Sequence, residues 1–256
     1  MSPRLSGLRL SIGTLSILRV PIADADRSTA GRAMACAPLI GAGIGVTAAA
    51  VGWAAQTYTN STLIAAVAAI GTYAAVTRAL HLDGLADVAD GLGSAKPREQ
   101  ALEIMKRSDI GPFGVVTLLL VLLLQIAALT SAYTHHRGAL AVIVAAITGR
   151  LAITLACTPS VPSARPDGLG AWVAGSVPLR TAIPVAASCV VAGFALGYLS
   201  DLPTAILAAV ACLVGLACAL VLLRRCVTRF GGITGDVLGA LVETAAAGAL
   251  LVMAVR

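Results

Sequence analysis

Residues 113–133 read FGVVTLLLVLLLQIAALTSAY, a run without a single charged side chain. About 20 consecutive apolar residues are what a helix needs to cross the hydrocarbon core of a bilayer. Lipid offers the backbone no hydrogen-bond partner, so such runs form helices unless they close into a barrel. Further runs of this kind lie at residues 33–55, 62–80, 139–158, 181–199, 203–223 and 233–255. The sequence therefore predicts an all-α, polytopic membrane protein with about seven transmembrane helices.

The composition agrees with this prediction. The chain has 256 residues, of which 58% are hydrophobic and 12% are charged, whereas a soluble domain is about 25% charged. We expect one membrane domain, 1–256, because neither an internal repeat nor a low-complexity linker is evident. Two shorter helices should complete it, an interfacial helix at 5–20 and an amphipathic cytoplasmic helix at 97–107. The latter lies in a cytoplasmic loop, about 81–111, that we expect to be catalytic.

The basic residues indicate which side faces the cytoplasm. All but three of the 18 lysines and arginines lie in the N-terminal segment or in the second, fourth and sixth loops. Arg137 and Arg256 lie on the opposite side, and Arg150 lies inside the fourth span. Because cytoplasmic loops carry the excess of Lys and Arg, the N-terminus and the even-numbered loops are expected in the cytoplasm. The expected location is the cell inner membrane, crossed several times, with the active site facing the cytoplasm.

Three aspartates stand close together in HLDGLADVADGLG, residues 81–93. Asp83, Asp87 and Asp90 are spaced i, i+4 and i+7, so a helix places them on one face. Three like charges on one face repel, and a divalent cation would stabilise them. Carboxylate oxygens without a set of His or Cys partners favour Mg²⁺ or Ca²⁺ over Zn²⁺. The alternative is a solvated acidic helix end at the membrane surface.

Cationic side chains follow in MKRSDIGPFG, where Lys106, Arg107 and Asp109 precede the third span. Two cations beside a carboxylate suit a phosphate-bearing ligand that is neutralised partly by metal and partly by protein. Arg165 lies in the Gly/Pro-rich loop SARPDGLGAW. This arginine is a candidate phosphate ligand, or else a charge that serves only the topology.

Two further acids lie in GGITGDVLGALVET, at the start of the last span. Asp236 and Glu243 are seven residues apart and therefore share a helix face. A charge inside a span costs about 2.5–3.5 kcal/mol on insertion scales, so both are functional candidates. Asp236 is also suited to capping the helix start. Glu243 lies too deep for capping and could instead form a buried ion pair with Arg150.

Four motifs occur in order along the chain: HLDGLADVADGLG, EIMKRSDIGPFGV, ARPDGLG and GGITGDVLGA. Together with GRAMACAPLIGAGIG in the first span, they resemble the cobalamin synthase family, the adenosylcobinamide-GDP ribazoletransferases, over nearly the whole chain. In one departure, the Asp and Arg of the family pattern MKDSRIG are exchanged here, as Lys106-Arg107-Ser108-Asp109. The exchange leaves open which of Arg107 and Asp109 fills which role.

The resemblance implies an enzyme that joins the two halves of the cobalamin coenzyme at the cytoplasmic face of the membrane. The 3′-hydroxyl of α-ribazole, or of its 5′-phosphate, attacks the cobinamide-linked phosphorus of adenosylcobinamide-GDP, GMP leaves, and Mg²⁺ is required. The partners are thus small-molecule substrates and membrane lipids, with no nucleic acid. The Ala/Gly-rich spans would permit a homo-oligomer.

Site roles follow from the resemblance combined with the residue types. Diphosphate displacement needs in-line positioning and neutralisation of the phosphate oxygens. We expect Mg²⁺ on Asp83, Asp87, Asp90 and Asp236, phosphates on Lys106, Arg107 and Arg165, and catalytic carboxylates at Asp87, Asp109 and Glu243, with Asp109 and Glu243 as alternative general bases. His81 is a candidate contact for phosphate or for the cobalt macrocycle, or else an ordinary interfacial histidine.

Two rival functions share some of these features. A CDP-alcohol phosphotransferase would match DVADG at 87–91, but its signature continues differently from Leu92-Gly93-Ser94, and Ala240 stands where its last aspartate would be. A divalent cation transporter would place carboxylates near the membrane midplane, often at broken helices or inverted repeats. Here most acids gather at one face and no repeat is evident, which argues against the transporter.

Overall fold

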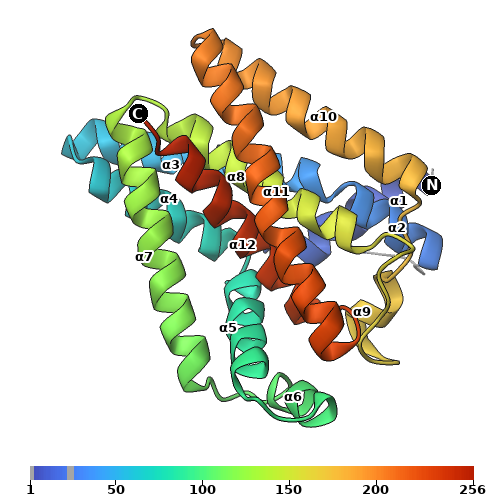
Figure 1. Ribbon diagram of the computed structural model, residues 1–256. Coiled ribbons are helices and arrows are strands. Elements are labelled where there is room, and N and C mark those ends of the chain that lie inside the picture. The colour runs from blue at the N-terminus through green and yellow to red at the C-terminus, as the bar shows by residue number, and fades with distance from the viewer. Residues whose placement is uncertain (1–2, 22–25) are drawn as a thin grey trace.

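The computed structural model describes residues 3–21 and 26–256, and every regular element within those ranges is a helix (Figure 1). The helices in chain order are α1 (Pro3–Leu15), α2 (Arg27–Ala35), α3 (Ala37–Thr59), α4 (Thr62–Val76), α5 (Leu80–Gly93), α6 (Arg98–Ile104), α7 (Pro112–Thr134), α8 (Gly138–Ala156), α9 (Gly168–Val173), α10 (Leu179–Tyr198), α11 (Leu202–Phe230) and α12 (Gly235–Met253). The predicted all-α class is confirmed.

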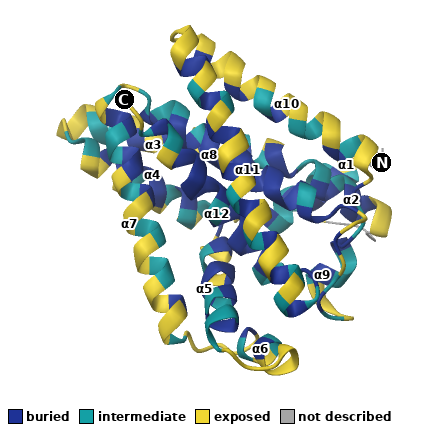
Figure 2. Cartoon of the chain, in the orientation of Figure 1, coloured by how far each residue is buried: buried dark blue, intermediate teal, exposed yellow. Residues whose placement is uncertain are grey.

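In the described part of the chain, six helices are long and apolar enough to cross a membrane: α3, α7, α8, α10, α11 and α12. The bent pair of α4 and α5 raises this number to as many as seven, so the prediction of a multi-pass membrane protein is also confirmed. The helices α8 and α12 form the centre, with 78% of the apolar window of each buried, against 22% for α7 and 17% for α10. Figure 2 shows the same contrast between dark blue α8 and α12 and the yellow faces of α7 and α10. Exposed apolar faces of this size suit contact with lipid.

The second predicted span, 62–80, is not one straight helix. The helix α4 ends at Val76, and α5 starts at Leu80 with its axis turned by 88°. Between them, Arg78 and Ala79 have φ angles of 57° and 55°. This left-handed conformation costs a non-glycine residue about 1–2 kcal/mol and interrupts a right-handed helix. As a result, α5 leaves the line of α4 and runs along α7 and α12 (Figure 1).

The N-terminal segment packs against the spans as two short helices. The first, α1, ends at Leu15, earlier than the predicted limit at residue 20. The segment that follows is held by a hydrogen bond from the Ile17 N–H to the Val76 carbonyl (2.7 Å). The first predicted span, 33–55, begins inside α2, and α3 starts after a break at Cys36.

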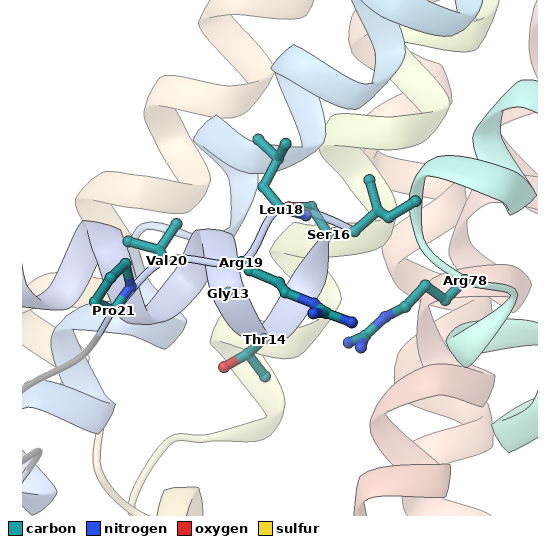
Figure 3. Close-up of a pocket in the computed structure, with 9 residues that line it drawn as sticks. Gly13, Thr14, Ser16, Leu18, Arg19, Val20, Pro21 and Arg78 are labelled. Atoms are coloured by element: carbon teal, nitrogen blue, oxygen red, sulfur yellow. The ribbon is translucent and has the colours of Figure 1, made fainter.

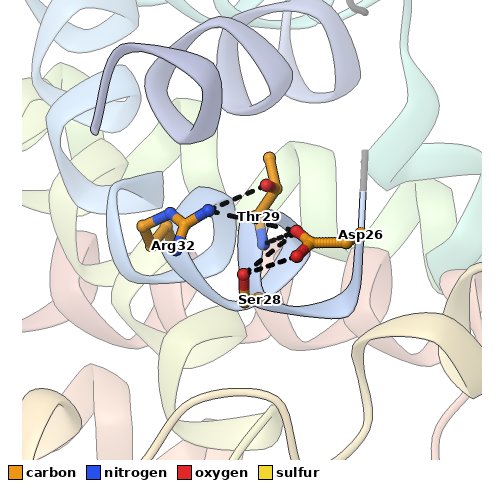
Figure 4. A network of polar contacts seen from close by, with 4 residues as sticks. All are labelled: Asp26, Ser28, Thr29 and Arg32. Atoms are coloured by element: carbon orange, nitrogen blue, oxygen red, sulfur yellow. Dashed lines mark hydrogen bonds and ion pairs between the residues drawn. The ribbon is translucent and has the colours of Figure 1, made fainter. Parts of the chain in front are cut away.

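Asp26 caps the start of α2 (Figure 4). Its carboxylate accepts hydrogen bonds from the Thr29 N–H (2.8 Å) and the Ser28 hydroxyl (2.8 Å), and lies 4.0 Å from the Arg32 guanidinium. Such a cap satisfies an amide that has no partner within the helix. Hydrogen bonding by Thr29, and then by Ser28, holds the pKa of Asp26 at about 2.

The short helix predicted at 97–107 is present as α6. Its apolar side packs inward, with Ala101 and Met105 buried and Leu102 half-buried. Met105 lies against Gly91 of α5, close to the buried ring of Phe230 at the end of α11. The helix therefore packs against the end of α5 and the end of α11, at the side of the molecule where the candidate site lies.

Candidate active site

The candidate site lies where α5 crosses the first turn of α12. At the crossing, Gly84 faces the backbone of Asp236, and a Cβ at position 84 would come within 2.6 Å of the Asp236 carbonyl oxygen. Only a residue without a side chain allows this approach. Asp83 and Asp87, on either side of Gly84 in α5, are thereby brought next to Asp236, a residue 149 positions after Asp87 in the chain.

Asp236 lies in the first turn of α12, just after the cap residue Thr234. The Thr234 hydroxyl accepts a hydrogen bond from the Val237 N–H (3.2 Å) and donates one to the Asp236 carboxylate (3.2 Å). The first turn of a helix favours negative charge because its amide groups point outward there. The cap therefore orients the Asp236 carboxylate, and the helix terminus stabilises its charge.

The carboxylates of α5 and α12 act on one another electrostatically. The negative charges of Asp236, Asp83 and Asp90 repel the Asp87 carboxylate, and the positive charge of Arg165 attracts it. Asp83 is exposed, whereas Asp87 and Asp236 are half-buried. Partly buried carboxylates that face one another repel, so the cluster favours an arriving cation.

Metal binding at this cluster remains a prediction. In the described residues, no group of three or more His, Cys, Asp or Glu side chains is arranged to hold a metal ion. The donor set of Asp83, Asp87 and Asp236 consists of carboxylate oxygens, which are the ligands that Mg²⁺ prefers. The chemistry of the cluster thus fits Mg²⁺, although the side chains do not form a closed ligand set.

Arg165 reaches the cluster from a loop that is fixed to the start of α12. Its guanidinium donates a hydrogen bond to the Leu102 carbonyl of α6 (2.6 Å). The loop is held by two backbone hydrogen bonds, from Ala164 N–H to the Ile233 carbonyl (3.0 Å) and from Ile233 N–H to the Pro162 carbonyl (2.9 Å). Arg165 is therefore positioned by α6 and by the segment before α12, and it balances the charge of the aspartates.

The predicted metal ligand Asp90 has a different set of partners. Its side chain is 7% exposed, and its two oxygens accept hydrogen bonds from the Gly111 N–H (2.8 Å) and the Gly114 N–H (2.9 Å). These amides belong to the start of α7, which has no other side-chain cap. We interpret Asp90 as the cap of α7. Each carboxylate oxygen keeps a second lone pair, so its predicted part in metal binding stays a prediction. The uncapped Gly-Pro start of the third span was the sequence signal for this role.

Three candidate residues of the cytoplasmic loop are exposed and have no side-chain partner among the described residues. Lys106, Arg107 and Asp109 are exposed between α6 and α7. Their side chains make no hydrogen bond or ion pair with any residue that the structure describes. The predicted phosphate contacts of Lys106 and Arg107 and the predicted base at Asp109 therefore stay predictions.

Glu243 is buried in the middle of the bundle, about two turns beyond Asp236. It is 2% exposed, and its carboxylate accepts a hydrogen bond from the Gln125 side chain of α7 (2.9 Å). No contact within 4.0 Å joins Glu243 to Arg150, although the positive charge of Arg150 acts on Glu243. The arginine is hydrogen-bonded to the Tyr73 hydroxyl and lies 4.5 Å from the centre of that ring. Gln125, which stands alone among apolar residues in the middle of its span, was not singled out from the sequence. Its contact argues against Glu243 as the general base.

His81 is internal rather than interfacial. Its side chain is 2% exposed, and neither ring nitrogen has a partner among the described residues. It lines a small cavity of about 30 Å³, together with Thr14, Gly235 and Gly239. The ring is therefore buried next to the start of α12. Its contact with a substrate remains a prediction.

Comparison with known proteins identifies the family. The sequence model described as Cobalamin-5-phosphate synthase matches residues 7–254. The chain belongs to this family. It is 50% identical over 241 residues to an adenosylcobinamide-GDP ribazoletransferase of Frankia casuarinae, covering 90% of this chain and 87% of that protein. Proteins with the same description from Nocardioides sp. and Corynebacterium diphtheriae are 41% and 34% identical, over 97% and 98% of this chain and 98% and 92% of theirs.

No solved structure matches the chain. Membership of the cobalamin-5-phosphate synthase family confirms the predicted resemblance and the prediction of a membrane-bound transferase of cobalamin synthesis. The match begins within α1 and ends after α12, so it covers every element of the candidate site. The rival interpretations as a phospholipid-type phosphotransferase or a cation transporter are therefore set aside.

Proposed function

We propose that this protein transfers the adenosylcobinamide-phosphate group of adenosylcobinamide-GDP to the 3′-hydroxyl of α-ribazole or of α-ribazole 5′-phosphate. The new bond joins the ribazole oxygen to the cobinamide-linked phosphorus. The bond that breaks joins this phosphorus to the bridging oxygen, and GMP leaves with that oxygen. The observation that carries the proposal is the juxtaposition of Asp83 and Asp87 with Asp236 and Arg165 in a chain of this family.

Asp83, Asp87 and Asp236 would hold Mg²⁺. Bound there, the ion would supply charge neutralisation at the oxygens of the diphosphate. Asp83 and Asp87 come from one helix and Asp236 from another, so the crossing of α5 and α12 would present carboxylates from both helices to a single substrate group. Asp90 is left out of this set because it is buried and its two oxygens accept hydrogen bonds from the start of α7.

Arg165 would bind a phosphate oxygen of the substrate. A guanidinium is a planar donor of several N–H groups, so one hydrogen bond to Leu102 leaves others available. A fixed donor also favours in-line attack by holding the phosphorus in one orientation. Asp87, at the centre of the charge cluster, is the carboxylate that we assign to catalysis.

We further propose that the site faces the cytoplasm from the inner membrane. The even-numbered loops, which carry most of the basic residues, include the α5–α6 region, α9 and the α11–α12 connection. These segments meet around the site through Arg165 and through the hydrogen bonds of Ile233. Soluble nucleotide substrates of the cytoplasm would then reach the cluster without crossing the bilayer.

The test is a transferase assay on the full chain in liposomes. Adenosylcobinamide-GDP, α-ribazole 5′-phosphate and Mg²⁺ are supplied, and GMP and the corrinoid product are quantified for wild type, Asp87→Asn and the control Glu99→Gln. Glu99 is exposed on α6 and has no contact with the cluster. We expect product from wild type and the control but not from Asp87→Asn or with chelator. Absence of GMP release from wild type with any divalent metal would refute the proposed function.

A further inference from the structure

A pocket of about 440 Å³ lies at the junction of the N-terminal segment with the α4–α5 turn. Its lining comes from residues 13–21, with the exception of Leu15, and from Arg78. Two of the lining residues are arginines, and Figure 3 shows the guanidinium groups of Arg19 and Arg78 directed toward the same space. Among the described residues, no acidic side chain lines the pocket.

The two arginines are positioned by the backbone rather than by partners of their side chains. Arg78 has a left-handed φ of 57° in the turn that ends α4. The segment that carries Arg19 is tied to the same turn by the hydrogen bond from Ile17 to Val76 (2.7 Å). A strained turn and a long-range backbone hydrogen bond thus bring two positive charges together, although like charges repel.

Neither guanidinium makes a hydrogen bond or an ion pair with any residue that the structure describes. Several other arginines behave differently, donating to backbone carbonyl groups: Arg27, Arg98, Arg137, Arg165 and Arg229. Arg19 and Arg78 are both exposed, so solutes can reach them. Two free guanidinium groups that share one pocket are suited to an oxyanion, which each can bind through paired N–H donors.

The pocket shares a lining residue with the small cavity at the start of α12. Thr14 lines it and also lines the small cavity that contains His81 and Gly235. Gly235 is the first residue of α12 and precedes Asp236. Ile17 and Leu18, which also line the pocket, are exposed apolar side chains. The pocket therefore combines two guanidinium groups with apolar side chains that suit contact with lipid.

We propose that Arg19 and Arg78 form a binding site for a phosphate group, separate from the cluster around Arg165. Two molecules carry the required chemistry. One is the guanosine phosphate part of the nucleotide substrate or product, an assignment that rests on the proposed function. The other is the headgroup of an acidic phospholipid, whose chains would lie against Ile17 and Leu18.

The experiment uses the purified full chain in neutral detergent and has two arms. In the first, GMP is titrated and its Kd is measured. In the second, the chain is equilibrated with equal amounts of phosphatidylglycerol and phosphatidylcholine, and the lipid retained after gel filtration is quantified. The variants are the double variant Arg19→Gln/Arg78→Gln and the single variant Arg78→Gly, and the control is Arg180→Gln, which removes an exposed charge elsewhere.

Arg78→Gly guards against misfolding, because glycine accepts the left-handed turn while the guanidinium is lost. A GMP Kd raised about tenfold or more in the double variant, but not in the control, would support a nucleotide source, as expected for lost charge-assisted hydrogen bonds. A selective loss of phosphatidylglycerol with unchanged GMP binding would support the phosphate site with a lipid source.

Equal GMP binding and equal lipid retention in the variants and the control would overturn the proposal, as would a wild type that binds neither probe. The outcome is separable from that of the transferase assay. An inactive chain that binds GMP through these arginines would keep the phosphate site and remove the proposed function. An active chain in which these variants change neither GMP binding nor lipid retention would keep the proposed function and remove the phosphate site.

Discussion

Gly84 lies directly against Asp236, so that a Cβ at position 84 would come within 2.6 Å of the Asp236 carbonyl oxygen and 2.9 Å of its Cα. Atoms of backbone, unlike the end of a flexible side chain, cannot move aside without shifting a helix. The contact therefore sets the separation of α5 and α12. The positions of Asp83 and Asp87 relative to Asp236 depend on it.

We expect Gly84→Ala to lower transferase activity at least tenfold, because catalysis is sensitive to displacements of about 1 Å. The measurement is GMP release by the variant in liposomes. Gly71→Ala is the matched control, since its Cβ would meet nothing within 4 Å, and in a helix this change should stabilise by up to about 1 kcal/mol. Full activity in Gly84→Ala would show that α5 and α12 are not held at this distance.

Replacing Asp90 with Asn should destabilise the fold without altering metal dependence. The amide nitrogen would face a backbone N–H at the start of α7, and an unsatisfied buried group costs about 1–3 kcal/mol. Thermal unfolding in detergent measures the loss, and a Mg²⁺ titration of the remaining activity measures the metal dependence. A raised Mg²⁺ requirement with unchanged stability would instead restore Asp90 as a ligand.

Removal of the Gln125 side chain should leave the Glu243 carboxylate without its hydrogen bond inside the bundle. We expect Gln125→Leu to cost about 1–3 kcal/mol of stability, and the double variant with Glu243→Leu to recover part of it, because replacing both partners removes the unsatisfied group. The unfolding midpoints of the single and double variants check this. Additive losses would argue against the contact.

Glu243→Gln separates a structural role from a catalytic one. The buried position beside Gln125 predicts that this variant keeps most of its transferase activity, whereas Asp87→Asn does not. GMP release at saturating substrate is the readout. Loss of activity in a Glu243→Gln protein of normal stability would return Glu243 to the catalytic residues.

The cap at Asp26 predicts a dependence of stability on pH. The pKa of this carboxyl is lowered from 3.8 to about 2 by hydrogen bonds in the folded state. A lowered folded-state pKa means that the stabilisation is complete above about pH 3.8 and is lost as the pH falls through about 2. Asp26→Ala should therefore have a lower unfolding midpoint than wild type at neutral pH, and the difference should shrink between pH 4 and 2.

The matched control for the cap is Asp167→Ala, because Asp167 precedes α9 without making a side-chain hydrogen bond. Its midpoint should follow that of wild type at every pH. A constant difference between Asp26→Ala and wild type from pH 7 to pH 2 would contradict the cap.

Local properties of the sequence determined the helical class, most of the spans and the short helix α6. The length and the periodicity of an apolar run depend only on consecutive residues. The run at 113–133 therefore predicts α7 without knowledge of the helices around it. The helical spacing of Asp83 and Asp87 was readable for the same reason. The four motifs were also sufficient to indicate the family.

Tertiary structure alone decided how these pieces meet. In the break after Val76, Arg78 and Ala79 adopt a left-handed conformation. No glycine or proline stands there to predict it from the sequence. A hydrogen bond from Ile17 to Val76 ties the N-terminal segment to this break. Helical spacing places Asp90 on the same face as the other aspartates. In the structure, however, its carboxylate accepts hydrogen bonds from two backbone amides at the start of α7. Contacts between distant segments depend on the packing of whole helices, and no pattern of consecutive residues encodes which carboxylate will face a cation and which a backbone amide.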